Sequence, residues 1–202
     1  MTESIAQRFR ERMAGKGVQV WCFVDDFLVA GASEEITAWA CQEFKALLKE
    51  FGLCWAPHKH RGAAQCMEFL GLLISNVDGH RRVGLTQKRT KKLRAMIDEW
   101  SSRRPKGREA YPADPREVAK LLGHLVFVSQ VVPCGRTYMQ AMLSSFAGLI
   151  VDWKRGGVRM PGGKSSRLYL QPSFWEDLSW WSAHLETRNS TPLGEPPPAE
   201  VA

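Results

Sequence analysis

Two adjacent carboxylates, Asp25 and Asp26, are the residues of this sequence best suited to chemistry. They lie between two apolar, β-prone runs, residues 18–23 and 27–30, so the pattern predicts a hairpin with the aspartates at its tip. The usual two-residue turns are Asn-Gly or Asp-Gly, because their central residues need positive φ. Neither pair is present, so either the tip is strained or the strand assignment is wrong. A hard divalent cation suits such a tip, since it prefers oxygen ligands and keeps several waters.

A solvated loop is the alternative to a metal site, and spacing alone does not separate the two. Against the loop, neighbouring carboxylates repel each other unless a cation or a basic group neutralises them. The functional interpretation is Mg²⁺ binding for phosphoryl or nucleotidyl transfer. In such sites two metals about 3.5–4 Å apart clamp the attacking and leaving oxygens.

Two helices are predicted to flank the hairpin and position its tip. Residues 3–15 carry apolar side chains at helical spacing, and Gly15-Lys16-Gly17 ends that helix. Ser33 is a candidate N-cap for the next helix, and Gly52 lies where a C′ glycine is expected.

The remainder of the chain is predicted to form a pair of strands followed by helices. Residues 67–75 and 82–85 are predicted strands, and Pro and Gly mark residues 104–113 as a linker. Asp114-Pro115-Arg116-Glu117 has the pattern of a capping box with Pro at the first helical position. The predicted helices of this half cover residues 86–103, 114–131, 135–150 and 172–185, with a Gly-rich hairpin-like excursion at 155–170.

The charge is concentrated in one segment. The 202 residues carry a net charge of +7, while residues 81–108 hold eleven Lys or Arg against Asp98 and Glu99. A concentrated basic segment indicates a polyanion, with nucleic acid first and an acidic membrane surface second. A solvated helix face is the alternative.

The cysteines and the N-terminus indicate an intracellular protein, in the cytoplasm or the nucleus. The five cysteines are odd in number and form no Cys-x-x-Cys pair, and no apolar signal-peptide core follows Met1. The longest apolar run falls far short of a membrane span, so no membrane partner is expected.

Several motifs, in order, resemble reverse transcriptases. Phe23-Val24-Asp25-Asp26 resembles their aromatic-x-Asp-Asp box, and the run 68–75, which contains Phe69-Leu70-Gly71, resembles the hairpin that grips the primer terminus in gypsy-like elements. Residues 116–123, 133–138 and 177–181 are similar to the segment after the palm in tyrosine-recombinase-type (DIRS-like) retrotransposons. The resemblance covers roughly residues 5–188.

The resemblance implies an α+β fold with four parts. Residues 1–85 would be the C-terminal half of a polymerase palm, with the Asp-Asp hairpin, a helix and the primer-grip hairpin. An all-helical thumb-like region would follow at 86–150, a connection region at 151–188 and a disordered tail at 189–202.

The resemblance also implies roles for single residues. Asp25 would bind the catalytic metals directly and Asp26 would support it, while Phe23 would buttress the hairpin and Val24 would pack near the primer terminus. Lys59 would lie near the phosphates of the incoming nucleotide, although His58 and His60 depart from the family pattern. Phe69, Leu70 and Gly71 would form the primer grip, with ordinary core packing as the alternative for Phe69 and Leu70. The residues expected to contact nucleic acid are Arg81, Arg82, Lys88, Arg89, Lys91, Lys92 and Arg94.

One departure from the family pattern limits the expected activity. A palm needs a third carboxylate on an earlier strand, and the acidic residues before Asp25 are Glu3 and Glu11, both in the predicted helix. We therefore expect a palm fragment that is inactive by itself. Completed by an upstream segment, it would bind Mg²⁺ or Mn²⁺, a dNTP, and a duplex of RNA template and DNA primer.

The sequence leaves two alternatives to a polymerase fragment open. The first is a non-catalytic, nucleic-acid-binding remnant of a retroelement. The second is a zinc-stabilised interaction module built on Cys54, His58, His60 and Cys66, whose spacing matches no standard zinc motif.

Overall fold

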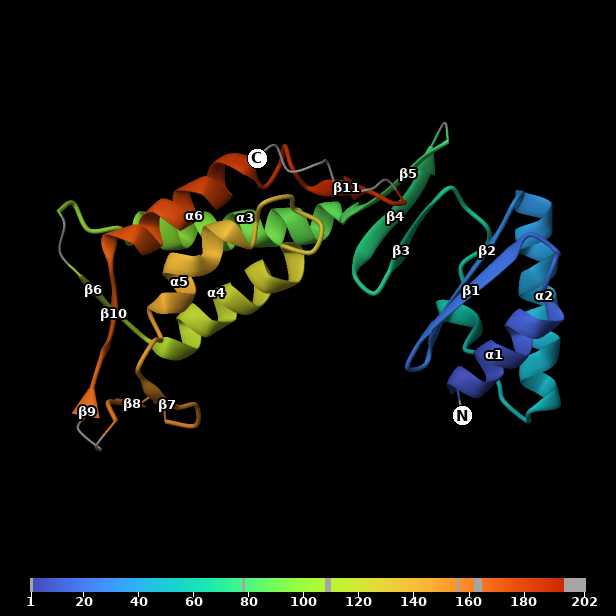
Figure 1. Cartoon of the computed structure of the whole chain (residues 1–202), viewed down its shortest axis with the longest axis horizontal. Coiled ribbons are helices and arrows are strands. Elements are labelled where there is room, and N and C mark those ends of the chain that lie inside the picture. Colours follow the sequence, from blue (N-terminus) through green and yellow to red (C-terminus); the bar gives the residue numbers. More distant parts are fainter. Residues whose placement is uncertain (1, 78, 108–109, 156, 162–164, 195–202) are drawn as a thin grey trace, which may run out of the picture. The chain divides into compact units, whose positions relative to one another are not determined.

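The structure is a computed structural model that describes residues 2–77, 79–107, 110–155, 157–161 and 165–194. The chain divides into two compact units, Met1–Leu70 and Gly71–Ala202 (Figure 1). This division lies earlier in the chain than the boundary near residue 86 that the sequence suggests. Helices and strands occur in both units, which confirms the α+β class.

The first unit is a hairpin covered by two helices. Its elements are α1 (Thr2–Arg12), β1 (Val18–Phe23), β2 (Asp26–Gly31), α2 (Glu34–Glu50), the 3-10 helix η1 (Pro57–Lys59) and β3 (Cys66–Phe69). An isolated two-stranded hairpin is marginal in water and needs a helix or further strands against it. Here one apolar cluster joins both helices to the hairpin, and it consists of Ile5, Phe9, Met13, Val20, Ala40, Phe44, Leu47 and Leu48.

The predicted ends of α2 are confirmed. The Ser33 side chain accepts a hydrogen bond from the Ile36 N–H at 3.2 Å, and Gly52 follows the helix with φ of 69°. A bidentate ion pair between Arg12 and Glu50, with N–O distances of 3.0 and 2.9 Å, ties α1 to the last turn of α2. Both ends of the helix that supports the hairpin are therefore fixed by local chemistry.

The second unit has a larger core, built on helices. Its helices are α3 (Gln87–Ser102), α4 (Pro115–Val128), α5 (Gln140–Ser144) and α6 (Pro172–His184), with the 3-10 helix η2 (Thr137–Met139). Its strands are β4 (Leu72–Val77), β5 (His80–Leu85), β6 (Tyr111–Ala113), β7 (Ile150–Asp152), β8 (Gly157–Arg159), β9 (Ser165–Ser166), β10 (Leu168–Leu170) and β11 (Ser190–Pro192). The core includes Leu93, Ile97, Leu121, Leu125, Phe174, Leu178 and Trp181.

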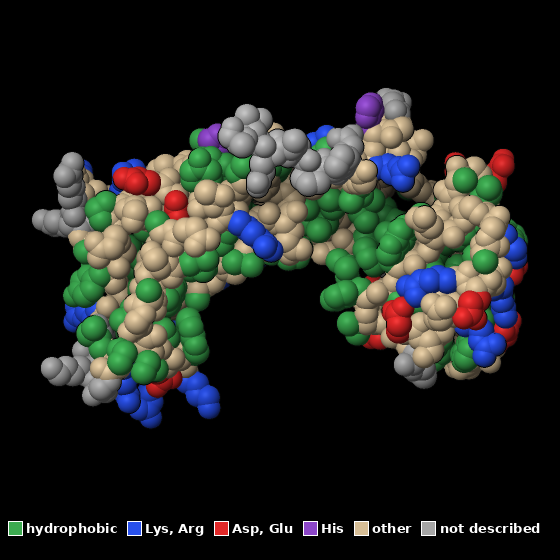
Figure 2. Space-filling model, viewed as in Figure 1, with side chains coloured by type: hydrophobic (Ala, Val, Ile, Leu, Met, Phe, Trp, Pro, Cys, Tyr) green, Lys and Arg blue, Asp and Glu red, His purple; other side chains and the backbone are tan. Residues whose placement is uncertain are grey.

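Large apolar side chains remain exposed in both units, and Figure 2 shows such side chains in green on the visible face. In the first unit they include Trp21, Phe23 and Val24. In the second they include Ile150, Trp153 and Met160, around β7 and β8. Among the described residues no helix is both long and apolar enough to cross a membrane.

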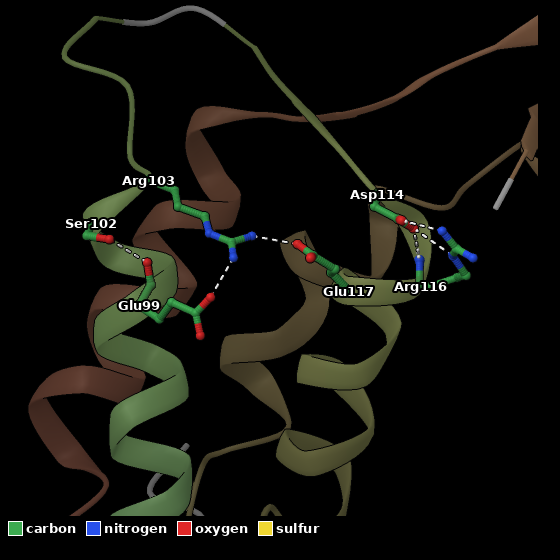
Figure 3. A network of polar contacts seen from close by, with 6 residues as sticks. All are labelled: Glu99, Ser102, Arg103, Asp114, Arg116 and Glu117. Carbon is green, nitrogen blue, oxygen red and sulfur yellow. Dashed lines mark hydrogen bonds and ion pairs between the residues drawn. The ribbon is translucent and has the colours of Figure 1, made fainter.

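A polar network joins α3 to the start of α4 (Figure 3). As predicted, the Asp114 carboxylate caps α4, accepting the Arg116 N–H at 2.8 Å. Glu117 does not complete a capping box; it accepts a hydrogen bond from Arg103 at 2.6 Å, and Arg103 also pairs with Glu99. The Arg103 guanidinium therefore bridges the two helices.

Three other predictions need correction. The strand predicted at 67–75 is broken into β3 and β4, because Leu70 and Gly71 have φ of 51° and 76°. The helix predicted at 135–150 is reduced to η2 and the short α5, since Tyr138 has a non-helical ψ of 38°. Within the tail predicted to be disordered, Ser190–Pro192 pairs with β5, whereas residues 195–202 lie outside the described part of the chain.

Candidate catalytic hairpin and nucleic-acid surface

The tip of the β1–β2 hairpin is a two-residue turn, Val24-Asp25. The strands are antiparallel with Phe23 opposite Asp26, so Asp26 is the first residue of β2 rather than part of the turn. The predicted strand start at residue 27 is therefore one residue late. Asp25 and Asp26 remain adjacent and both are exposed.

The strain expected at the tip lies in Val24. Its φ is 55°, a region that β-branched residues rarely adopt. Asp25 is not among the residues with positive φ, so the turn has the sign pattern of type II′, where glycine normally takes the first central position. Such a conformation costs on the order of 1–3 kcal/mol and persists only where the surroundings enforce it.

The inner face of the hairpin provides that enforcement. Phe27, next to Asp26, packs against Phe44 of α2 with ring centroids 4.8 Å apart, and Phe9 of α1 meets the same ring at 4.9 Å. Arg10 of α1 donates a hydrogen bond from Nε to the Val20 carbonyl at 3.2 Å. Both helices therefore hold the strands that carry the aspartates.

The outer face of the hairpin carries Asp26 among exposed aromatic residues. Side chains alternate between the two faces of a strand, so Asp26 lies on the face opposite Phe27. Its cross-strand partner Phe23 is 59% exposed, and Trp21 on the same face is also exposed. The carboxylates therefore border an open surface that includes aromatic rings.

No group of three or more His, Cys, Asp or Glu that could hold a metal ion is found among the described residues. Asp25 and Asp26 thus have no third carboxylate beside them in that part of the chain. The same finding is against the zinc module, because Cys54, His58, His60 and Cys66 do not gather into such a group.

Phe69 is the last residue of β3, and Leu70 and Gly71 form the tight turn before β4. Leu70 is exposed, so core packing is the wrong interpretation for it, whereas Phe69 is half-buried. The Gly71 carbonyl accepts a hydrogen bond from Arg89 Nε at 3.1 Å. A Cβ at Gly71 would lie 2.5 Å from Arg89 Nη2, at the end of a flexible side chain, so a substitution would shift the guanidinium, and the positive φ is what favours glycine here.

Lys59 belongs to η1 by its backbone. Its side chain lies outside the described part of the structure, so its role at nucleotide phosphates stays a prediction.

The basic segment divides into arginines with intramolecular partners and exposed lysines. Arg82 bonds Ser190, and Arg94 bonds the Ser182 carbonyl and Asp98. Arg89 bonds Gly71 and lies over the Phe127 ring at 4.2 Å. Lys88, Lys91 and Lys92 are exposed at i, i+3 and i+4 of α3, on one face of the helix, and Arg81 is exposed on β5.

The neighbouring helix α4 adds basic groups that the sequence pattern did not single out. His124 is half-buried, and its pKa is lowered by burial first and then by the positive charges of Lys92, Arg89 and Lys120. These charges come from both α3 and α4. Spacing along one helix could not reveal this, because the cluster depends on how the two helices pack.

The downstream motifs contact one another. Trp181 donates a hydrogen bond from Nε1 to the Tyr138 carbonyl at 2.8 Å, and Trp180 stacks on the Tyr138 ring at 4.2 Å. Asp177 accepts the Ala141 N–H at 3.0 Å. Residues 133–138 and 177–181 are therefore paired parts of one structural joint.

Comparison with known proteins supports the interpretation of the first unit. A family model described as reverse transcriptase (RNA-dependent DNA polymerase) matches residues 1–74. A search of curated proteins finds no match. The resemblance to reverse transcriptases is thus confirmed for residues 1–74, which include both aspartates, while the narrower likeness to DIRS-like and gypsy-like retrotransposons stays a prediction.

Proposed function

We propose that this chain carries part of the active site of an RNA-directed DNA polymerase, with Asp25 and Asp26 as its carboxylates. The reaction is attack of a primer 3′-hydroxyl on the α-phosphate of a nucleoside triphosphate, with release of pyrophosphate. The observation that carries the proposal is the strained Val24-Asp25 turn, held by two helices, inside the stretch that matches reverse transcriptases.

The two aspartates fit Mg²⁺, with Mn²⁺ as the alternative. Mg²⁺ in nucleotidyl-transfer sites binds to one or two carboxylates together with substrate phosphates and waters, so a third protein ligand is not needed for an initial complex. When bound, the metal lowers the pKa of the attacking hydroxyl and neutralises charge on the phosphates. Asp25 is the direct ligand and Asp26 supports it.

Residues of the hairpin tip and of the 69–71 turn are proposed to orient the primer end. Phe23 lies opposite Asp26 and buttresses the turn, and the exposed Val24 contacts the primer terminus. Phe69, Leu70 and Gly71 form the primer grip, and Arg89 holds its backbone through the Gly71 carbonyl. Lys59 is proposed to meet the nucleotide phosphates.

Duplex binding is proposed for the face of α3. Lys88, Lys91 and Lys92 contact phosphates of the template–primer duplex, joined by Arg81 and by Lys120 of α4. Such contacts are independent of sequence, which suits a polymerase. Arg82, Arg89 and Arg94 act indirectly, since their guanidinium groups have partners within the second unit. Residues 86–150 correspond to a thumb and residues 151–188 to a connection.

Catalysis is proposed to need a further carboxylate-bearing strand, because none accompanies Asp25 among the described residues. Another segment of the polypeptide or a second chain would supply it. Residues 1–202 alone would then bind nucleic acid without extending a primer. The same observation favours the second candidate function, a non-catalytic nucleic-acid-binding remnant.

Primer extension separates the two candidates. A polypeptide that places a carboxylate-bearing palm strand upstream of residue 1 should extend a DNA primer on an RNA template. Asp25→Asn should abolish extension, while Glu186→Gln, at an exposed carboxylate far along the chain, should not. Extension that survives Asp25→Asn would refute the metal-ligand role, and a completed polypeptide that never extends primers would favour the remnant.

A further inference from the structure

A second basic surface lies on the hairpin of β7 and β8, outside the stretch that matches reverse transcriptases. The strands are antiparallel, with Val151 opposite Val158 and Ile150 opposite Arg159. Val158 is buried, so the Val151–Val158 pair faces the protein. Because faces alternate, Ile150 and Arg159 lie on the outward face, and Ile150 is 59% exposed.

The turn of this hairpin presents an aromatic ring that two cationic residues, Lys154 and Arg155, follow directly in the sequence. The Asp152 carboxylate accepts the backbone N–H groups of Lys154 and Arg155 at 3.0 and 3.1 Å, which fixes the turn. Trp153 is 56% exposed, and its one aromatic neighbour among the described residues is Phe146, with centroids 6.1 Å apart. Trp153 therefore lies near Phe146 and leaves more than half of its surface open to solvent.

The charge of the hairpin is strongly positive. Asp152 is the one acidic residue of the sequence between 150 and 167, and its carboxylate is engaged in the turn. Lys154, Arg155 and Arg159 are exposed, and the ion pairs of the described residues include none of them. Figure 2 shows basic side chains gathered at the lower left, where Figure 1 draws β7 and β8.

We propose that this β7–β8 surface binds single-stranded nucleic acid, with a base stacked on Trp153 and phosphates on Lys154, Arg155 and Arg159. Exposed aromatic rings on a surface that also carries basic side chains hold unpaired bases without reading their sequence. A base inside a duplex has no free face for Trp153, so an unpaired strand is the ligand that uses both features. The choice of nucleic acid over an anionic membrane rests on the proposed polymerase function.

Fluorescence anisotropy with the full chain and labelled oligonucleotides tests the proposal. Trp153→Ala should weaken binding of single-stranded RNA or DNA about tenfold and leave duplex binding nearly unchanged. Arg155→Ala with Arg159→Ala should weaken single-strand binding and flatten its salt dependence. Trp39→Ala is the matched control, since Trp39 is also exposed and has Lys16 over its ring at 5.3 Å.

Three results would overturn the proposal. They are unchanged single-strand affinity in Trp153→Ala, an equal loss for duplex and single strand, and vesicles of phosphatidylserine that bind through Trp153 while oligonucleotides do not. Circular dichroism of each variant must match the wild type, which is expected because Trp153 is exposed.

The binding test is independent of the catalytic proposal because it needs neither a metal ion nor a nucleoside triphosphate. If Asp25 proves dispensable for primer extension while Trp153→Ala loses single-strand binding, the catalytic proposal fails and this inference stands. If Asp25 proves essential for primer extension while Trp153→Ala keeps single-strand binding, this inference fails and the catalytic proposal stands.

Discussion

At the scale of single residues, the tip of the β1–β2 hairpin holds a valine in a conformation suited to glycine. Val24 is 67% exposed, so its side chain gains little from packing that would offset the strain. The neighbouring strands are held by Phe27 and Phe44, which keeps the turn in place. Backbone strain that the surrounding structure maintains is typical of functional sites. Here the strained residue, Val24, comes immediately before Asp25.

Replacing Val24 should therefore stabilise the protein. Val24→Asn should raise the free energy of unfolding by roughly 0.5–1 kcal/mol, since asparagine tolerates positive φ better than valine. Val77→Asn is the matched control, because Val77 is also exposed but lies in β4 without positive φ. Urea denaturation measures both, and a Val24→Asn variant less stable than the wild type would contradict the assignment of strain.

Gly71 leads to the opposite expectation. Gly71→Ala should destabilise by about 1–2 kcal/mol, because φ is 76° and the new Cβ would displace the Arg89 guanidinium. Gly62→Ala should change stability little, since no atom lies within 4 Å of a Cβ there and φ is not positive. Equal unfolding free energies for the two variants would refute the requirement for glycine at the turn.

At the scale of elements, the second unit depends on a joint between the 133–145 segment and α6. Asp177 receives the Ala141 N–H, Trp181 bonds the Tyr138 carbonyl, and Gly135 leaves room for the Trp181 ring, where a Cβ would lie 2.7 Å away. The Trp181 bond is accepted by the carbonyl of Tyr138, whose non-helical ψ of 38° lies inside η2, shortly before α5 begins. The contacts of residues 177–181 are thus explained by packing within the second unit.

Asp177 makes this joint sensitive to pH. Burial raises the pKa of the Asp177 carboxyl above its ordinary value of 3.8. Hydrogen bonds from the N–H groups of Met142 and Ala141 lower the pKa, but the effect of burial is larger. A folded-state pKa above the unfolded one favours the protonated, folded form. The contribution of this group to stability is therefore complete below pH 3.8 and is lost as pH rises through the raised folded-state pKa.

Comparing the wild type with Asp177→Asn tests the direction in which the stability contribution of Asp177 changes with pH. The difference in unfolding free energy, wild type minus variant, should fall as pH rises from about 3 toward neutrality and then level off. Denaturation in urea across that range supplies the values. A difference that is flat, or that grows with pH, would contradict the raised pKa.

Much of this element structure could be predicted from the sequence because it depends on local signals. Ser33, Thr86 and Asp114 cap helices as their types suggest. The bonds of Arg89 to Gly71 and of Arg94 to Ser182 could not be foreseen, since both join residues distant in the chain. The hairpin was predictable from its apolar runs, but the placement of strain at Val24 depended on the strand register.

At the scale of the whole molecule, the described residues include a hairpin proposed for catalysis and two cationic surfaces proposed to bind nucleic acid. The α3 surface of Lys88, Lys91 and Lys92 is proposed for duplex, and the β7–β8 surface for an unpaired strand. The family match extends to residue 74 and so covers the aspartates but neither surface. Binding measurements on duplex and single strands can therefore be interpreted separately from catalysis.

The α3 surface predicts duplex binding that depends strongly on salt. Replacing Lys88, Lys91 and Lys92 with alanine should weaken duplex affinity and reduce the slope of log affinity against log salt by about 2–3. A triple alanine variant at Arg8, Lys16 and Lys49 removes equal charge from the first unit and should change that slope less. Equal effects of the two triple variants would indicate that net charge alone governs binding.

Whether Asp25 is a direct metal ligand in nucleotidyl transfer is tested most directly by a substitution that changes which metal ion supports the reaction. Asp25→Cys, in the polypeptide completed by an upstream carboxylate strand, should lose primer extension with Mg²⁺, because a thiolate is a poor ligand for a hard cation. Extension should return in part with the more thiophilic Mn²⁺ or Cd²⁺, and Asp26→Cys should show a weaker switch. An Asp25→Cys enzyme that works with Mg²⁺ as well as the wild type would contradict the claim.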